Sequence, residues 1–373
     1  MAEEASLLTA PSANLQSNIN LQEQCPLFTI LPAEIRSLIY TYALTDYEDI
    51  THDGQSYDRN TYWYRPGYKA RRRTATELLR SCKRVFQETW FMPFALAEHS
   101  FYLMHQDRAP PRRVTLERMR QYLATLRDFA RIQDGKDIPQ IHSIRVFAQL
   151  WALEDPRRLQ EVLNLEGFRP RNVTITIRYT DFWFWERNAP LHIDARWVNT
   201  VIFPESVSTI KMDFEMVDRR KKEIDFITDL AVEKWVFRRA DGIIFRANKE
   251  DTVTSGWTGS STWAKARWIR DESRPNEIDF YVKTVTWKPT FDGDNPFAGS
   301  YKCPNLDIPS DFVQEPVLWL QGMASVPIDW LASAGVPNEA SAEEVAQAVG
   351  RRPIRARGQH RPIRRRPRPE TDE

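Results

Sequence analysis

The sequence predicts an α+β fold, in which an N-terminal helical module packs on a body built around a mixed, partly parallel α/β sheet, with disordered termini. Two observations carry this prediction. Residues 25–44 and 77–90 repeat apolar side chains every three or four positions, as amphipathic helices do. Further along, three strand-like segments begin about 32 residues apart and alternate with helix-length segments. Such spacing is typical of crossovers between parallel strands.

The predicted N-terminal module consists of two helices. Pro32 suits the first turn of the earlier helix, where its missing N–H leaves no hydrogen bond unmade. Pro93 is expected to end the later helix. Because neither helix can bury its apolar stripe alone, we expect the two stripes to pack against each other. The first stripe is Leu31, Ile35, Leu38, Ile39 and Tyr42, and the second is Leu78, Cys82, Val85, Phe86 and Thr89.

These two segments also carry a family resemblance. The run from Leu31 to Tyr40 (L-P-x-E-I-R-x-x-I-Y) and the run from Leu78 to Phe86 resemble the F-box-like family of fungal proteins that has an E-x-R signature. The resemblance covers residues 26–103, and the segment TITIRYTDFWFWE extends it into the body. It implies a helical adaptor module that docks a Skp1-like subunit of a cullin ubiquitin ligase. In an F-box the two halves are contiguous, whereas here residues 46–75 intervene.

The body is predicted from alternating strand and helix patterns. A short strand at 99–103 precedes a helix at 115–132, and Asp155 and Pro156 are expected to begin another helix. The strand at 172–186 has the strongest pattern, and its prediction includes the aromatic run 182–185. From residue 234 onward, short alternating runs with Asp-Gly turns at 241–242 and 292–293 predict an antiparallel meander. Further strands are expected at 141–150 and 207–216, and further helices at 219–233 and, with Ser341 and Glu344 as a capping box, at 336–350.

Composition is that of a globular protein, with 42% hydrophobic and 28% charged residues. The net charge of +1 hides a division: residues 351–373 contain nine Arg and three acidic residues, so this tail carries +6 and the first 350 residues carry −5. Three widely spaced Cys indicate neither a disulfide framework nor a zinc site, and favour a reducing, intracellular location, nuclear or cytoplasmic. Neither a signal peptide nor a membrane-spanning segment is expected.

These patterns predict five parts. Residues 1–24 form a disordered lead-in, 25–110 the helical module with an insertion at 46–76, and 111–335 the α+β body. Residues 336–350 form a short helix and 351–373 a disordered, Arg-rich tail, since almost nothing in the tail can be buried.

Two aromatic-rich regions allow alternative interpretations. In the insertion, Tyr and Trp side chains interleave with Arg and Lys over residues 62–73, which would suit stacking on single-stranded nucleic acid. We favour an ordered loop whose aromatic side chains pack on the body and whose Arg side chains face water. Trp257, Trp263, Trp268 and Trp287 could line a ligand surface, but we favour core positions for them.

No motif for catalysis, phosphate binding or metal binding is present, and the six His are scattered. We therefore predict no enzyme, no cofactor, no metal site and no small-molecule ligand, although an enzyme with its site in the Trp-rich sheet remains an alternative.

The sequence leads to two functional hypotheses. The first is a protein-interaction protein that offers Leu31, Pro32, Ile35 and Ile39 to an adaptor such as a Skp1-like protein. The second is a nuclear, nucleic-acid-associated protein that relies on the 62–73 loop and the tail. The tail could also act as a nuclear import signal read by an importin; its candidate residues are Arg351, Arg352, Arg355, Arg357, Arg364, Arg365 and Arg366.

Overall fold

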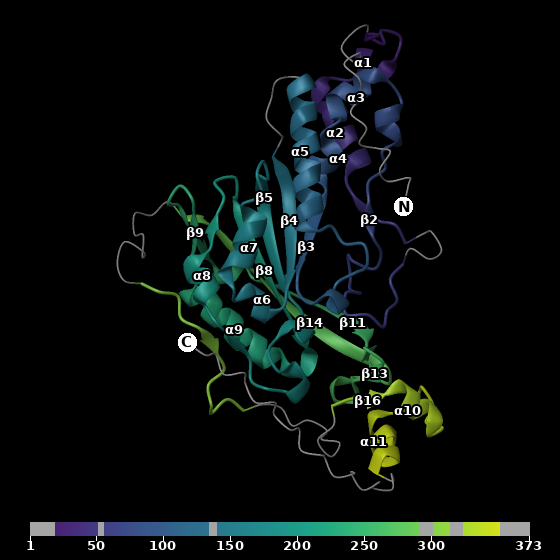
Figure 1. Ribbon diagram of the computed structural model, residues 1–373, viewed down its shortest axis with the longest axis vertical. Coiled ribbons are helices and arrows are strands. Elements are labelled where there is room, and N and C mark those ends of the chain that lie inside the picture. The colour runs from purple at the N-terminus through teal and green to yellow at the C-terminus, as the bar shows by residue number, and fades with distance from the viewer. Residues whose placement is uncertain (1–18, 51–55, 134–139, 291–300, 314–323, 351–373) are drawn as a thin grey trace, which may run out of the picture.

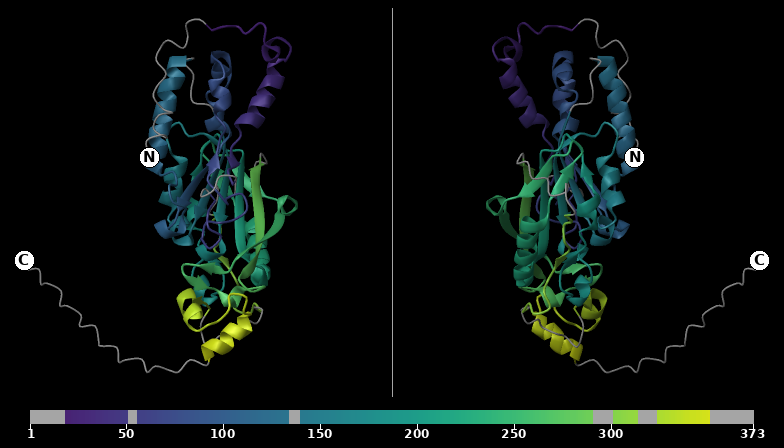
Figure 2. Two further views of the ribbon diagram at one scale, coloured as in Figure 1. Left: turned by 90° about the vertical axis from the view of Figure 1, so that its right-hand side faces the viewer. Right: turned by 90° about the vertical axis from the view of Figure 1, so that its left-hand side faces the viewer.

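A computed structural model describes residues 19–50, 56–133, 140–290, 301–313 and 324–350. Its centre is a nine-stranded mixed sheet (Figure 1). The N-terminal helices lie at one end of the molecule, and helices α10 (Ile328–Ser333) and α11 (Ala342–Gly350) lie at the opposite end (Figure 2). The fold is therefore α+β with a mixed, partly parallel sheet, as the sequence predicts. The predictions of disordered termini concern residues 1–24 and 351–373. Of these, only residues 19–24 are described by the structure.

One half of the sheet is parallel. Its strands are β3 (Glu98–Leu103), β4 (Ile141–Ala148), β5 (Pro170–Ile177) and β8 (Thr209–Val217), and they lie side by side in that order. The chain crosses between them through α5 (Leu116–Gln133), α6 (Leu150–Leu153) with α7 (Pro156–Leu163), and α8 (Arg196–Thr200). The predicted crossovers are confirmed. The expected helix start is also confirmed, because the Asp155 side chain accepts a hydrogen bond from the backbone N–H of Arg157 at 3.3 Å.

The other half of the sheet is antiparallel and centres on the long strand β14 (Glu277–Thr290). It pairs with β8 on one side, and with β10 (Ile244–Ala247) and β11 (Val253–Ser260) on the other. Strand β9 (Phe237–Arg239) forms a hairpin with β10, and Gly242 in its turn has a φ of +87°, which glycine tolerates best. The predicted antiparallel pairing and the turn at 241–242 are confirmed, but the strands do not form a simple meander, because β10 pairs with β14 and not with the next strand, β11. The turn at 292–293 lies outside the described residues. Two further elements are β7 (Ile202–Phe203), parallel to β9, and α9 (Lys221–Lys234), which contacts β8, β10 and β14.

The two faces of the sheet differ in chemistry. Alternate residues such as Val146, Ile175 and Met212 are completely buried in the large apolar core, together with Trp197 and Trp287. The opposite face carries charged and polar residues, among them Arg145, Thr176 and Asp213. Trp263, Trp268 and Trp287 are buried and Trp257 is partly buried, so the core interpretation of these Trp is confirmed.

The strand predicted over 172–186 is too long. Strand β5 ends at Ile177, and two 3-10 turns follow, Tyr179–Asp181 before the aromatic run 182–185 and Trp185–Arg187 at its end. The first turn is held by the Arg178 side chain, which bonds to Asp181. Between the two turns Phe184 has a φ of 51°, a left-handed conformation that no strand allows. Tertiary contacts of the same segment, from Arg178 to Tyr62 and from Tyr179 to Asp271, override the aromatic β-propensity of this run.

The second N-terminal helix is shorter than predicted. Residues 77–90 form a 3-10 turn followed by α3, and Cys82 lies at the N-cap, where its Sγ accepts from the backbone N–H of Val85 at 3.5 Å. Pro93 does not end a helix; it lies in the first turn of α4. The elements are α1 (Pro26–Thr29), α2 (Ala33–Leu44), β1 (Tyr47–Glu48), β2 (Arg72–Arg73), the 3-10 turn Glu77–Arg80, α3 (Lys83–Thr89) and α4 (Met92–Leu96).

The C-terminal elements form a small unit with its own apolar cluster around Ile269, Leu331 and Val345. The predicted capping box is confirmed: Glu344 accepts from the backbone N–H of Ser341 at 2.7 Å, and Ser341 accepts in return from that of Glu344 at 3.3 Å. The elements are β12 (Thr262–Trp263), β13 (Ala266–Arg267), β16 (Val326–Pro327), α10 (Ile328–Ser333) and α11 (Ala342–Gly350), while β6 (His192–Ile193) pairs with β15 (Leu306–Asp307) elsewhere.

Candidate protein-interaction surface

Helix α2 is anchored through one side only. Tyr40 and Leu44, which are 2% and 0% exposed, pack with Val85 and Met92 in the cluster that joins α2 to α3 and α4. Burial raises the pKa of Tyr40 to about 12, so its hydroxyl stays neutral in this contact. The same side of α2 is held by an ion pair as well.

That ion pair joins Arg36 to Glu88 with two hydrogen bonds, from Nε at 3.1 Å and from Nη2 at 3.0 Å. A third bond runs from Arg36 Nη1 to the carbonyl oxygen of Leu31 at 2.9 Å. A bidentate guanidinium–carboxylate pair fixes both distance and orientation. Arg36 therefore holds α2 in register with α3 and fixes which side of α2 faces outward.

The outward side of α2 is apolar. Tyr42 is 78% exposed, Leu38 51%, Ile35 44% and Ile39 41%. We call these four residues the α2 face. Phe86 and Trp90 pack on Phe129 of α5, so residues 77–96 lie between α5 and α2, as Figure 2 shows. Because α2 is the outermost helix of this end, the α2 face is open to solvent.

This arrangement corrects the expected packing. The stripe of Leu31, Ile35, Leu38, Ile39 and Tyr42 does not bury against the second helix; all but the half-buried Leu31 are exposed. Tyr40 and Leu44, which the stripe omits, make the contact. The helix has apolar side chains on two sides, and periodicity alone does not say which side meets the protein. Of the four predicted partner-binding residues, Pro32, Ile35 and Ile39 are exposed and Leu31 is half-buried at the start of the helix.

The basic-aromatic loop, 62–73, is packed onto the polar face of the sheet. The Tyr68 ring meets Phe147 edge-on at 4.9 Å, and Tyr62 lies 6.3 Å from Trp263. Its Arg residues meet carboxylates: Arg65 pairs with Glu215 at 3.3 Å and is 8% exposed, Arg73 pairs with Asp49 at 2.8 Å, and Arg72 pairs with Asp46. The aromatic side chains thus pack on the body, as we expected. The Arg side chains were expected to face water, but Arg65, Arg72 and Arg73 pair with carboxylates.

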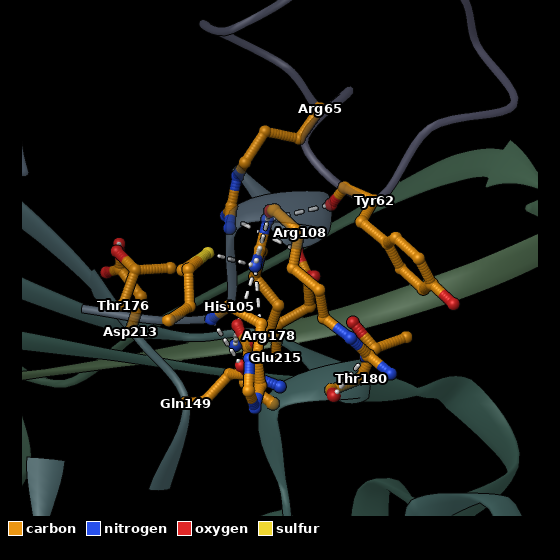
Figure 3. A network of polar contacts seen from close by, with 12 residues as sticks. Tyr62, Arg65, His105, Arg108, Gln149, Thr176, Arg178, Thr180, Asp213 and Glu215 are labelled. Atoms are coloured by element: carbon orange, nitrogen blue, oxygen red, sulfur yellow. Dashed lines mark hydrogen bonds and ion pairs between the residues drawn. The ribbon is translucent and has the colours of Figure 1, made fainter. Parts of the chain in front are cut away.

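A buried polar network, not anticipated from the sequence, lies where the parallel strands end (Figure 3). Arg178 follows β5, is 3% exposed, and donates to Asp181, to the carbonyl oxygen of Tyr62 at 2.8 Å and to that of Arg108 at 3.3 Å. The cavity beside it, lined by Arg65, Glu215 and aromatic rings, measures about 30 Å³. That is room for about one water molecule. Ligands often bind at the carboxyl ends of parallel strands, but here the space is filled by the protein's own side chains.

The network extends to the C-terminal unit. Asp271 accepts from the Tyr179 hydroxyl at 2.6 Å and from Arg270 at 3.0 Å, and it also pairs with Arg219. Burial acts to raise the pKa of Asp271, but the guanidiniums of Arg219 and Arg270 outweigh it and hold that pKa below its ordinary value. Asp271 therefore joins its own segment to those of Tyr179 and Arg219, and we assign it no catalytic role.

Other site types find little support in the described residues. Within the ranges that the structure covers, no three or more His, Cys, Asp or Glu side chains are grouped so as to hold a metal ion. No helix of the described part is both long and apolar enough to cross a lipid bilayer. The tail residues predicted to bind anions lie in 351–373, outside the described ranges. Comparison with known proteins found no matching family model, no matching curated protein and no matching solved structure.

Proposed function

We propose that this chain is a protein-interaction protein and that the α2 face binds a helix of its partner. The observation that carries the proposal is the exposure of four large apolar side chains on one side of a helix whose other side is fixed by Arg36 and Glu88. Isolated exposed apolar residues are normal, whereas a contiguous patch is typical of a binding surface. Helices commonly bind through residues spaced three and four apart, as these are.

Burial of the α2 face would supply part of the binding free energy. Completely burying an Ile or Leu side chain contributes about 1.5–3 kcal/mol. Ile35, Leu38 and Ile39 are already about half-buried, whereas Tyr42 is 78% exposed. Each would therefore add about 1 kcal/mol on binding, or about 4 kcal/mol for the α2 face before ordering costs. Contacts at its rim must supply the rest, and Pro32 and the exposed Ile30 extend the surface toward α1.

The F-box-like resemblance suggests the partner. It implies that the module, here residues 26–103, docks a Skp1-like adaptor, so that the α+β body would recruit a substrate to a ubiquitin ligase. Ile35 and Ile39 are exposed within the segment that carries the resemblance, and this supports the proposal.

The test uses the purified full chain and a purified Skp1-like protein, with binding measured by calorimetry. The variant Ile35→Glu/Ile39→Glu should lose binding by at least about tenfold while keeping the wild-type melting temperature, because both side chains are exposed. A matched control is Ile202→Glu/Val253→Glu, which changes two exposed apolar residues elsewhere and should bind as the wild type does. If the wild-type chain ignores the Skp1-like protein, the ligase assignment is wrong. If the wild-type chain binds and the α2 variant binds equally well, the α2 face is not the binding surface.

A further inference from the structure

Strand β3 forms one edge of the large sheet. It pairs with β4 on its inner side, and no strand of the described residues pairs with its outer side. Its six residues span about 20 Å. In a parallel pair, the backbone N–H and C=O groups of every second residue point away from the neighbouring strand. Proteins usually protect such an edge, because it is a template for pairing with another chain.

A groove of about 230 Å³ runs along this edge. Its lining includes residues 97–100 and Tyr102 from the region of β3, together with the segments 71–74 and 110–114. Pockets for whole small molecules are larger, at about 300–1,000 Å³. The groove therefore suits the side chains of a peptide lying against β3 better than a separate small ligand.

The lining of the groove is basic. It includes five Arg (71, 72, 73, 112 and 113) and two acids, Asp46 and Glu98, a net charge of +3. Both acids are already matched, since Asp46 pairs with Arg72, and Glu98 pairs with Arg145 at 3.3 Å. Arg73 is also paired, with Asp49 at 2.8 Å, so the positive charge that an incoming carboxylate would meet comes chiefly from Arg112 and Arg113.

Arg112 and Arg113 are the groove's most available cations. Arg112 is exposed, Arg113 is half-buried, and neither has an ion pair within the described part of the chain. Two prolines precede Arg112, and its φ is 60°. A left-handed conformation is costly for a residue other than glycine, and such strain is often found at binding sites. This backbone sets the position of Arg112 at the rim of the groove.

We propose that the outer edge of β3 binds an acidic, extended segment of another protein. The segment adds a strand to the sheet through its backbone, and its acidic side chains reach Arg112 and Arg113. The pairing supplies affinity and the arginines select for acidic sequences. This site is separate from the α2 face and does not depend on what that face binds.

The test measures binding of labelled peptides to the full chain by fluorescence anisotropy. The probe is an acetylated hexapeptide that alternates Glu and Val, compared with the same peptide carrying N-methyl groups on alternate backbone nitrogens and with a Lys–Val version. N-methylation removes the donors that a new strand needs, so it should weaken binding by at least about tenfold. The Lys–Val peptide should bind more weakly still. Equal binding of the N-methylated peptide, or no binding of the Glu–Val peptide, would overturn the proposal.

Charge variants locate the site. The variant Arg112→Glu/Arg113→Glu should weaken binding of the Glu–Val peptide by at least about tenfold. The control Arg131→Glu/Arg246→Glu makes the same change in net charge at exposed positions outside the groove, and should change binding by less than about twofold. Equal loss in both variants would show attraction by overall charge and refute a β3 site. The Ile35→Glu/Ile39→Glu variant should bind this peptide normally, so failure of the α2 proposal and failure of this one can be told apart.

Discussion

Replacing Arg178 with Met tests whether the buried network holds the insertion to the sheet. The Arg178 side chain is 4% exposed and its partner, the Asp181 side chain, is 0% exposed. The two bonds between them are 2.6 Å from Nε and 3.1 Å from Nη2. Arg178→Met keeps most of the volume but removes the charge and every donor. Asp181 would then be a buried carboxylate without its cation.

The cost can be worked out from these contacts. Breaking a buried ion pair by removing one partner costs about 3–5 kcal/mol, because the remaining charge stays buried. The carbonyl oxygens of Tyr62 and Arg108 also lose their donor, so we expect the upper part of this range. A surface pair provides the comparison. Arg157, whose side chain is 89% exposed, pairs with Asp155, and Arg157→Met should cost far less, because solvent screens an exposed pair.

The assay is urea unfolding at pH 7, followed by Trp fluorescence and circular dichroism. Arg178→Met should lower the midpoint much more than Arg157→Met, and native-state proteolysis should become faster within the insertion, near Tyr62. The double variant Arg178→Met/Asp181→Asn also removes the unpaired carboxylate of Asp181, so it should recover part of the lost free energy of unfolding. If Arg178→Met costs no more than the surface variant, the account of the network is wrong.

Two further predictions concern pH and the tail. Burial lowers the pKa of His99 below its ordinary 6.5, so this residue stabilises the fold above that pH and its contribution is lost as the pH falls through 6.5 toward the folded-state pKa. His99→Gln keeps a donor for the Phe94 carbonyl but does not titrate, so its melting temperature should fall less than that of the wild type between pH 7 and 5; equal falls would contradict this. If the chain binds nucleic acid through the tail, removal of residues 351–373 should abolish binding of a single-stranded oligonucleotide, and wild-type binding should drop steeply with salt. Unchanged binding of the truncated chain would exclude the tail.

Much of the fold could be predicted because its signals are local. The alternation in β4 and β8, the stripe of α5, the Asp155 cap and the Ser341–Glu344 box depend on residues a few positions apart. The aromatic run 182–185 shows where prediction from local signals fails. Its composition favours a strand, but β5 ends at Ile177, and the next residues, Arg178 and Tyr179, bond to Tyr62 and Asp271, which lie 116 and 92 residues away.

The candidate surface was predicted in part. The segment around Ile35 and Ile39 was correctly placed on a helix, but its apolar stripe was expected to face the second helix. Arg36 and Glu88, which lie 52 residues apart, set the rotation of α2 and turn that stripe outward. No local pattern reveals such a pair, because either apolar side of the helix could have been buried.

The amino-acid sequence by itself determined the order of strands and helices, the crossovers of the parallel half and the separation of a basic tail from an acidic body. Only the tertiary structure decided which side of α2 is open, where β3 leaves an unpaired edge and which acids neutralise the Arg residues of the insertion. The physical reason is the range of the interactions. Periodicity and capping act within a few residues, whereas Arg178 and Tyr62, which fasten the insertion to the sheet, are 116 residues apart and meet only when the whole chain folds.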